Sequence, residues 1–188
     1  MTVTNVTPTD LPAGTWEIDP IHSSVEFSAR HMMVSKVKGR FTSMSGTITV
    51  AEDPLALASS VEATIEAASV DTHDTNRDNH LRSADFFDVE RYPTITFRST
   101  NVRVGTGGHV LVGELSIHGV TRTVELDLEH NGTGPDPYGG VRTGFSATTE
   151  VNRKDFGLTF SGTIEGTGGA VVGDKVSIAL EIEAILKP

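Results

Sequence analysis

The segment from His73 to His80 is the one place in this sequence where imidazoles and carboxylates crowd together, and it reads His-Asp-Thr-Asn-Arg-Asp-Asn-His. Its two histidines, together with Asp74 and Asp78, are residue types that ligate metal ions, and a histidine beside a carboxylate can carry out acid–base catalysis. An acidic residue or a threonine near the start of a helix instead accepts backbone amide hydrogens and interacts favourably with the helix dipole. We therefore interpret the cluster as a capped helix, with contact to the polar end of a ligand, and metal or acid–base chemistry, as the alternatives.

The rest of the sequence lacks the motifs of common catalytic sites. It contains no G-x-S-x-G or H-E-x-x-H pattern and no glycine-rich phosphate loop. Because the chain has no cysteine, it has no disulfide, no cysteine-ligated zinc and no thiol nucleophile. His22 and His118 stand alone in the sequence, and we expect them to form hydrogen bonds at strand ends. We therefore expect no enzyme activity and no metal site.

The composition is that of a single soluble domain. The chain has 188 residues, of which 37% are hydrophobic and 21% charged. Its 15 Lys and Arg against 25 Asp and Glu give a formal charge of -10 at pH 7, which repels nucleic acid and anionic lipid surfaces. No apolar run reaches the roughly 18 residues that cross a bilayer. We therefore expect neither nucleic-acid binding nor stable membrane insertion.

The amino terminus bears on location. Residues 1–13 are rich in Thr, Pro and Asp and lack the basic start and apolar run of a secretory signal peptide. We expect these residues to form a flexible tail ahead of one domain spanning residues 14–188. A cytoplasmic location follows as the expectation, with a periplasmic or secreted one as the alternative for a truncated chain.

The elements that must position any site are strands, because apolar and polar residues alternate with a period of two through most of the sequence. Glycine-rich turns at 105–108, 131–137 and 166–169, and a short connection at His118-Gly119, predict antiparallel neighbours. Residues 75–83 break the alternation and predict a short helix, and residues 30–36 predict another helical turn. The clearest strands are expected at 25–29, 61–67, 111–117, 124–128, 145–151 and 176–186, with weaker ones near 39–50 and 93–104.

About eight long antiparallel strands with one apolar face each can form a sandwich or close into a barrel. Small residues on the apolar face, such as Ala29, Ala63 and Gly113, leave part of an eight-stranded interior unfilled. The sequence therefore predicts an all-β fold, an extended eight-stranded antiparallel barrel with one or two short helices and an apolar tunnel. A barrel filled by its own phenylalanines stays open as an alternative. The side chains expected to line the tunnel are Phe27, Phe41, Ile65, Phe97, Leu115, Ile117, Leu126, Phe145, Ala147, Ile178 and Leu180.

Several short motifs, in order, resemble the YceI-like, lipocalin-like polyisoprenoid-binding family over residues 15–187. Each motif is weak alone, and their joint spacing is specific. The matching residues are Trp16 to Phe27, Arg30-His31, Gly39 to Phe41, Asn76 to Asp78, His80-Leu81, Asp85 to Asp88, Tyr92 to Phe97, Gly113 to Leu115, His118 to Thr121 and Arg153 to Gly157.

The resemblance implies a lipocalin-like barrel that encloses an elongated apolar tunnel. It implies non-covalent binding of a long isoprenoid lipid, such as a polyprenyl chain or a quinone tail, without turnover and without a cofactor. Many members are secreted to the periplasm, so the absence of a signal peptide in this sequence is a departure. The sequence says almost nothing about oligomeric state, so a homodimer stays open.

The polar head of such a lipid needs partners at the mouth of the tunnel. Asn76, Arg77 and His80 are the candidates, because Arg forks two hydrogen bonds to an anion and His offers one. Two other functions stay open: an enzyme or accessory factor acting on a small apolar substrate through the 73–80 cluster, and a stress-response module with a filled barrel. A hollow interior without converging titratable groups would favour the carrier.

Overall fold

The computed structural model describes residues 11–52, 59–105, 108–162 and 171–188. Strands dominate these residues, with one α-helix and two single-turn 3-10 helices at Ala67–Ser69 and Arg153–Phe156. The elements are β1 (Gly14–Ile18), β2 (Ser24–His31), β3 (Ser35–Phe41), β4 (Met44–Val50), β5 (Ser60–Glu66), β6 (Val70–Asp71), α1 (Thr75–Arg82), β7 (Thr94–Gly105), β8 (Gly108–Ile117), β9 (Val120–Pro135), β10 (Val141–Asn152) and β11 (Val172–Leu186).

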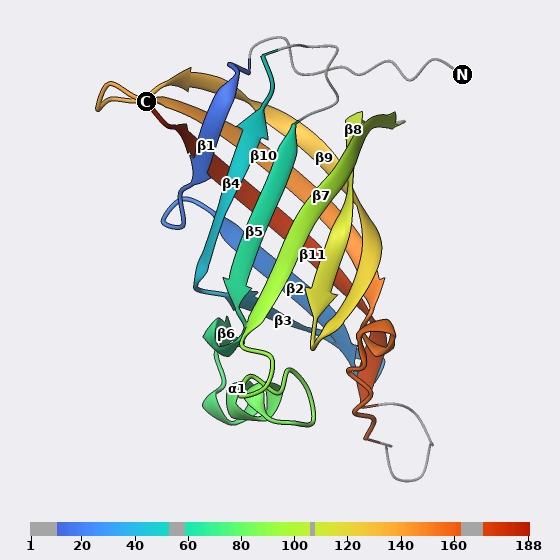
Figure 1. The fold of residues 1–188 in the computed structure, drawn as a ribbon. Coiled ribbons are helices and arrows are strands. Elements are labelled where there is room, and N and C mark those ends of the chain that lie inside the picture. Colours follow the sequence, from blue (N-terminus) through green and yellow to red (C-terminus); the bar gives the residue numbers. More distant parts are fainter. Residues whose placement is uncertain (1–10, 53–58, 106–107, 163–170) are drawn as a thin grey trace.

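Eight of the strands close into an antiparallel barrel (Figure 1). The ring runs β1-β4-β5-β7-β8-β9-β10-β11 and closes where β11 pairs with β1, with Ile18 opposite Ala184. A closed ring leaves these strands no unpaired edge. The barrel expected from the period-two alternation and from the resemblance is therefore confirmed.

The fifteen-residue strand β11 pairs with β10 along one edge and with two different strands along the other edge. Its last residues pair with β1, and the stretch from Val172 to Glu181 pairs with β2. From β2 the sheet continues through β3 to β6, which contacts α1. This branch carries α1 to one end of the barrel, the lower end in Figure 1.

The helical turn expected at residues 30–36 is wrong. These residues form the hairpin between β2 and β3, with Met32 and Met33 in the turn at positive φ values of 50° and 61°. The expected strand near 39–50 is in fact two strands. The chain bends at Thr42, whose backbone N donates to the carbonyl of Ser69 at 3.1 Å, so β3 and β4 pair with different neighbours.

The turn expected at residues 131–137 begins later than predicted. Strand β9 continues through Asn131 and Gly132 to Pro135, and the turn lies where the backbone N of Asp136 donates to the carbonyl of Gly140 at 2.9 Å. Gly132 has a φ of 116°, and the register between β9 and β10 shifts beside it, opposite Gly144. Gly132 therefore lies at a β-bulge within β9, and it does not end the strand as the sequence suggested. The expected turn at residues 166–169 lies outside the described residues.

The hairpin at His118-Gly119 and the helix at residues 75–83 are confirmed. His118 and Gly119 have positive φ values of 53° and 73°, as a tight two-residue hairpin requires, and α1 ends at Arg82.

Leu11 and Trp16 pack in the core at the opposite end from α1, and the Trp16 indole Nε1 donates to the Pro12 carbonyl at 3.1 Å. Among the described residues, no helix has both the length and the apolar character to cross a bilayer.

Candidate functional site: the barrel cavity

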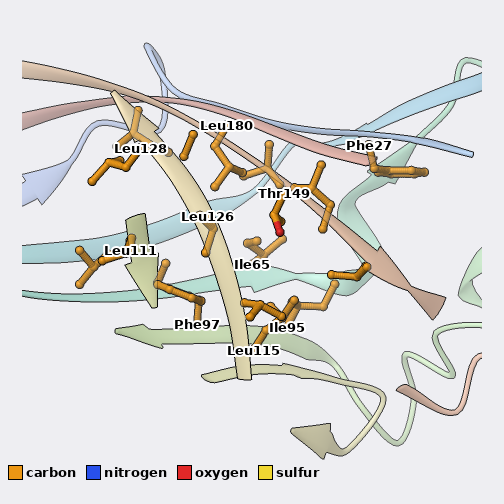
Figure 2. A pocket seen from close by; sticks show the side chains of 18 of the residues that line it. Phe27, Ile65, Ile95, Phe97, Leu111, Leu115, Leu126, Leu128, Thr149 and Leu180 are labelled. Carbon is orange, nitrogen blue, oxygen red and sulfur yellow. The ribbon is translucent and has the colours of Figure 1, made fainter. Parts of the chain in front are cut away.

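The barrel encloses an apolar cavity of about 330 Å³. Its wall is built by the inward-facing residues of the strands, and Figure 2 shows such side chains from several strands pointing into one space. On β7 the lining runs from Ile95 to Val104, nine steps that span about 30 Å along the strand. The cavity is therefore long as well as apolar.

The same alternation that forms the barrel makes the wall. On β11, Ile178 and Leu180 line the cavity while Lys175 and Glu181 are exposed, because successive side chains of a strand point to opposite faces. All eleven residues expected at the tunnel lie on the cavity wall. That they contact a lipid stays a prediction.

Residues within α1, after α1 and after β10 close the wall at the α1 end, and the strand pattern of the sequence does not assign them to the site. They are Leu81, Phe86, Phe87, Phe156 and Leu158. The Phe87 ring lies against Phe41 of β3, with the centroids 5.7 Å apart, which joins this end to the strand wall. For Phe86 and Phe87 the sequence signal is an apolar pair inside the polar motif Asp85 to Asp88, which no strand periodicity assigns to a face.

Polar side chains interrupt the apolar wall: Thr149 and Arg153 line the cavity, as do two histidines towards the end opposite α1. His130 lines the cavity, its Nε2 lies 2.9 Å from the Thr143 hydroxyl and 3.2 Å from the Thr133 hydroxyl, and its ring packs on Phe145. His109 lines the cavity as well. The wall thus offers hydrogen-bonding groups at the end opposite α1.

The polar cluster at residues 73–80 caps a helix, as interpreted from the sequence. The Asp74 carboxylate accepts from the backbone N of Arg77 at 2.9 Å at the start of α1. Buried Asp78 accepts from the backbone N and the hydroxyl of Thr72, at 2.8 and 2.6 Å. The helix is thereby fastened to the segment that follows β6, and its side chains stabilise structure.

The three residues expected at a lipid head group do not lie on the cavity wall. Arg77 donates from Nε and Nη2 to the hydroxyl and carbonyl of Thr72, at 2.7 and 2.9 Å. His80 Nε2 lies 2.8 Å from Asp85, and its ring packs against Phe86, which does line the cavity. Asn76 is exposed on α1. A head-group role for Asn76, Arg77 and His80 stays a prediction, and Arg77 and His80 already have partners within the fold.

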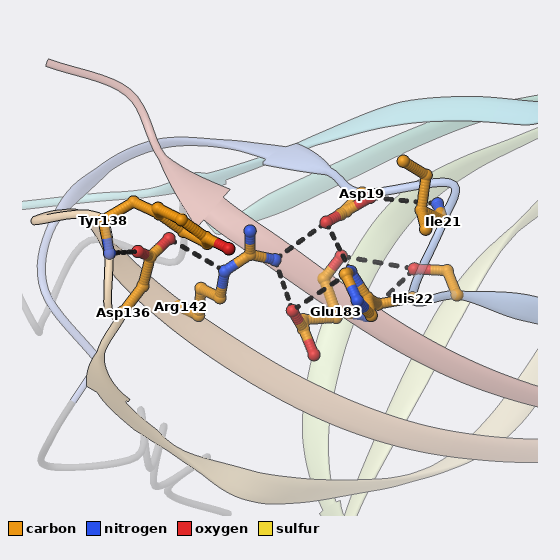
Figure 3. A network of polar contacts seen from close by, with 8 residues as sticks. Asp19, Ile21, His22, Asp136, Tyr138, Arg142 and Glu183 are labelled. Carbon is orange, nitrogen blue, oxygen red and sulfur yellow. Dashed lines mark hydrogen bonds and ion pairs between the residues drawn. The ribbon is translucent and has the colours of Figure 1, made fainter.

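A second polar network fixes the end of β1 on the outside of the barrel (Figure 3). Arg142 donates from Nη1 to Asp19 at 2.7 Å and to Glu183, and from Nε to Asp136 at 2.9 Å. The Arg142 guanidinium, with help from His22, holds the pKa of the buried Asp19 carboxyl well below its usual range. The surrounding carboxylates in turn raise the pKa of Arg142.

This network also contains the group of potential metal ligands that the described residues bring together. Ligand atoms of Asp19, His22 and Glu183 all lie within 4.8 Å of one another. Arg142 Nη1 donates to both carboxylates of this group, so the guanidinium already neutralises negative charge that a metal ion would otherwise neutralise. The potential ligands between His73 and His80 do not converge in this way. The expectation that the chain holds no metal stays a prediction.

Arg153 is a buried charged residue that fixes the chain after β10 to the start of β11. Only 4% of its surface is exposed, and its guanidinium donates to the carbonyls of Leu158 and Gly173 at 2.6 and 3.0 Å and to Asp174 at 3.0 Å. Gly157 follows with a φ of 79°, in the left-handed region that glycine adopts without strain. These contacts hold Leu158 in place at the α1 end of the cavity.

Comparisons with known proteins agree with this architecture. The family model for the YceI-like domain matches residues 16–184. A UPF0312 protein of Vibrio cholerae is 41% identical over 168 residues, which cover 88% of this chain and 83% of the relative. A UPF0312 protein of Serratia proteamaculans is 42% identical over 139 residues, or 73% of this chain and 71% of the relative.

Solved structures share the barrel. The YceI protein of Campylobacter jejuni is 32% identical with a TM-score of 0.68, covering 85% of this chain and 90% of that protein. BcnA of Burkholderia cenocepacia has a TM-score of 0.74 at 24% identity, covering 88% and 98% of the two chains. A polyisoprenoid binding domain from Saccharophagus degradans has a TM-score of 0.65 at 17% identity, covering 92% and 98%. The last two likenesses establish the common fold.

Proposed function

Because this chain belongs to the YceI-like domain family, we propose that it binds a long-chain isoprenoid lipid, a polyprenyl chain or a quinone tail, and releases it chemically unchanged. The observation that carries the proposal is the elongated apolar cavity, whose wall extends along β7 from Ile95 to Val104. The polyisoprenoid binding domain from Saccharophagus degradans shares the barrel and supports the choice of ligand class.

The energetics favour a long apolar chain. Each methylene group moved from water into the cavity contributes about 0.8 kcal/mol, so many repeated units outweigh the entropy lost on ordering the tail. The wall contains both large and small side chains, and Phe97 and Ala63 are directly paired on it.

The site supports binding over catalysis and over a filled barrel. The hollow interior disfavours the stress-response module packed by its own side chains. An enzyme acting on a small apolar substrate would use the 73–80 cluster, but none of these eight residues lines the cavity, and Asp74 caps α1. Binding without turnover is therefore the function that this arrangement supports best.

Mass spectrometry of the purified protein tests the proposal. The protein is purified without detergent, extracted with organic solvent, and the extract is compared with that of a variant whose cavity is obstructed. We expect an apolar lipid whose homologues differ by isoprene units, recovered from the parent and depleted from the variant. Stripped parent protein should also take up a long-chain quinone in preference to its tail-less head group. Equal uptake of the two, with no lipid in the extract, would refute the proposal.

A further inference from the structure

The turn between β2 and β3 exposes three consecutive large apolar side chains. Met32, Met33 and Val34 are 40%, 60% and 83% exposed, and only Ile21, Val104 and Tyr138 join them as exposed large hydrophobics in the described residues. Single exposed apolar side chains are ordinary, whereas a contiguous group marks an interaction site. We name Met32, Met33 and Val34 the hairpin tip.

The backbone of the hairpin tip is ordered and strained. Met32 N donates to the Val171 carbonyl at 2.9 Å, and Val34 N donates to the His31 carbonyl at 3.1 Å. Met32 and Met33 both have positive φ, at 50° and 61°, in a turn geometry that Asn and Gly adopt far more readily. Neither burial nor turn preference explains methionine at these two positions, so a role in binding is the better explanation.

The strands leading into the hairpin tip are basic, although the whole chain carries a formal charge of -10. Residues 28–40 contain no Asp or Glu, and Arg30 lies directly opposite Lys36 in the β2–β3 pairing, where like charges destabilise a sheet. Lys38 follows on the same outward face. In the described part of the chain, Arg30, Lys36 and Lys38 have no ion-pair partner, while Arg40 pairs with Asp71 at 3.2 Å.

We propose that the hairpin tip docks on a membrane surface that contains anionic lipids. Met33 and Val34 enter the boundary between head groups and acyl chains, and Arg30, Lys36 and Lys38 meet the lipid phosphates. This combination of an apolar tip and flanking cations is the pattern of interfacial membrane binding. Salt screens charges beyond about 10 Å at 0.1 M ionic strength, so the cations beside the hairpin tip act on the lipid phosphates more strongly than the carboxylates on remote parts of the barrel do.

The position of the hairpin tip relates it to the cavity. Ala29, two residues before His31 on β2, lines the cavity, and His31 pairs with Val172, which lines it too. The hairpin therefore continues the cavity wall outward at the end of the barrel that carries α1 (Figure 1). Docking through the hairpin tip would bring this end of the cavity to the bilayer.

Vesicle co-sedimentation tests the docking directly, with vesicles of phosphatidylcholine alone and of phosphatidylcholine mixed with phosphatidylglycerol. The apolar variant combines Met33→Ser with Val34→Ser, and the charge variant combines Lys36→Gln with Lys38→Gln. Matched controls are Ile21→Ser with Tyr138→Ser, which remove exposed apolar groups away from the hairpin tip, and Arg98→Gln with Arg122→Gln, which remove charge elsewhere.

We expect the parent to bind the mixed vesicles and to bind phosphatidylcholine vesicles more weakly. Each lysine removed should lower the affinity for the mixed vesicles about fivefold, since a cation near an anionic surface contributes about 1 kcal/mol. The apolar variant should bind weakly to both kinds of vesicle, and the two controls should bind like the parent. Added salt should weaken the parent more than the charge variant.

The proposal fails if the parent does not bind the mixed vesicles, or if folded variants of the hairpin tip bind as well as their controls. It also fails if the parent self-associates through the hairpin tip and the apolar variant merely becomes monomeric. Thermal melts establish folding. Lipid cargo is measured separately by extraction, so loss of docking with retained cargo is distinguishable from failure of the proposed lipid binding.

Discussion

Arg142 Nη1 lies 2.7 Å from Asp19 Oδ2, and this contact joins two residues that are 123 positions apart in the sequence. It fastens the end of β1 to the start of β10, on either side of β11. Because Asp19 also accepts from the backbone N of Ile21 and contacts His22, one carboxylate shapes the whole connection between β1 and β2.

The Asp19→Asn variant should therefore unfold more readily at neutral pH. The substitution removes the charge from a buried group that contacts Arg142, which costs about 1–3 kcal/mol in the free energy of unfolding. Urea denaturation of the variant beside Asp127→Asn, an exposed position on β9, measures the difference. Equal destabilisation by the two substitutions would contradict the role assigned to Asp19.

The same carboxylate predicts a dependence of stability on pH. The folded state holds the pKa of Asp19 below its ordinary value of 3.8, mainly through the hydrogen bond from Arg142. A lowered folded-state pKa stabilises the fold above the unfolded-state pKa, and that contribution is lost as the pH falls towards the folded-state pKa. The gap in unfolding free energy between parent and Asp19→Asn should therefore narrow on acidification below pH 3.8. A gap that stays constant would contradict the prediction.

Arg153 and Lys154 are adjacent and both contact Asp174, yet they should differ strongly in importance. Arg153 is buried and its guanidinium also donates to backbone carbonyls, so Arg153→Met should lower the free energy of unfolding by about 3 kcal/mol. Lys154→Met removes an exposed ion pair and should cost about 0–1 kcal/mol. Chemical denaturation measures both, and similar losses would show that Arg153 is not the anchor.

A glycine of β8 makes room for a ring of the cavity wall. A Cβ at Gly113 would meet the Phe97 ring and lie 2.7 Å from the Arg98 carbonyl O, whereas a Cβ at Gly134 would meet nothing within 4 Å. Gly113→Ala should thus cost about 1–3 kcal/mol, and Gly134→Ala should change stability by less than about 0.5 kcal/mol.

A second substitution tests the cause. Phe97→Leu replaces the ring that the added methyl group meets with a smaller side chain. The double variant with Gly113→Ala should therefore lose less free energy of unfolding than the sum of the two single losses. Additive losses in urea denaturation would place the strain elsewhere.

The sequence predicted the barrel and much of the wall because both follow from one period-two pattern. Phe145 and Ala147 were assigned to the interior by parity alone, and both line the cavity. The network around Asp19 escaped prediction because its partners Arg142 and Glu183 come together only when β1, β10 and β11 are adjacent. No local pattern carries that information.

Two other regions had no periodic pattern to read. The cavity end at Phe86 and Phe87 lies in a non-repetitive segment after α1, where side-chain direction depends on packing. The sequence predicts a helical turn at residues 30–36 because the charged residues and methionines there favour helix more than a tight hairpin turn. Pairing of β2 with β11 and β3 overrides that local preference.

Ala147 offers the sharpest test of the cavity. It faces the interior from β10, pairs with Leu180 and Leu128, and packs with Leu111 and Leu126 on the wall. Ala147→Phe adds a ring on this side and should reduce the amount of long-chain lipid that the protein carries. Added volume in a packed site costs about 1–3 kcal/mol, whereas a ring that enters hollow space costs less.

The control for Ala147→Phe is Thr148→Phe, which adds a similar ring to the next residue of β10, where the side chain is exposed on the outer face. The two variants therefore differ in the face that carries the ring rather than in the residue added. Binding of a long-chain quinone and the yield of extracted lipid are measured for both, with thermal melts to establish folding. Lipid content should fall in Ala147→Phe alone, because only its ring occupies space that the tail needs. If folded Ala147→Phe carries as much long-chain lipid as Thr148→Phe, the lipid does not lie against this wall.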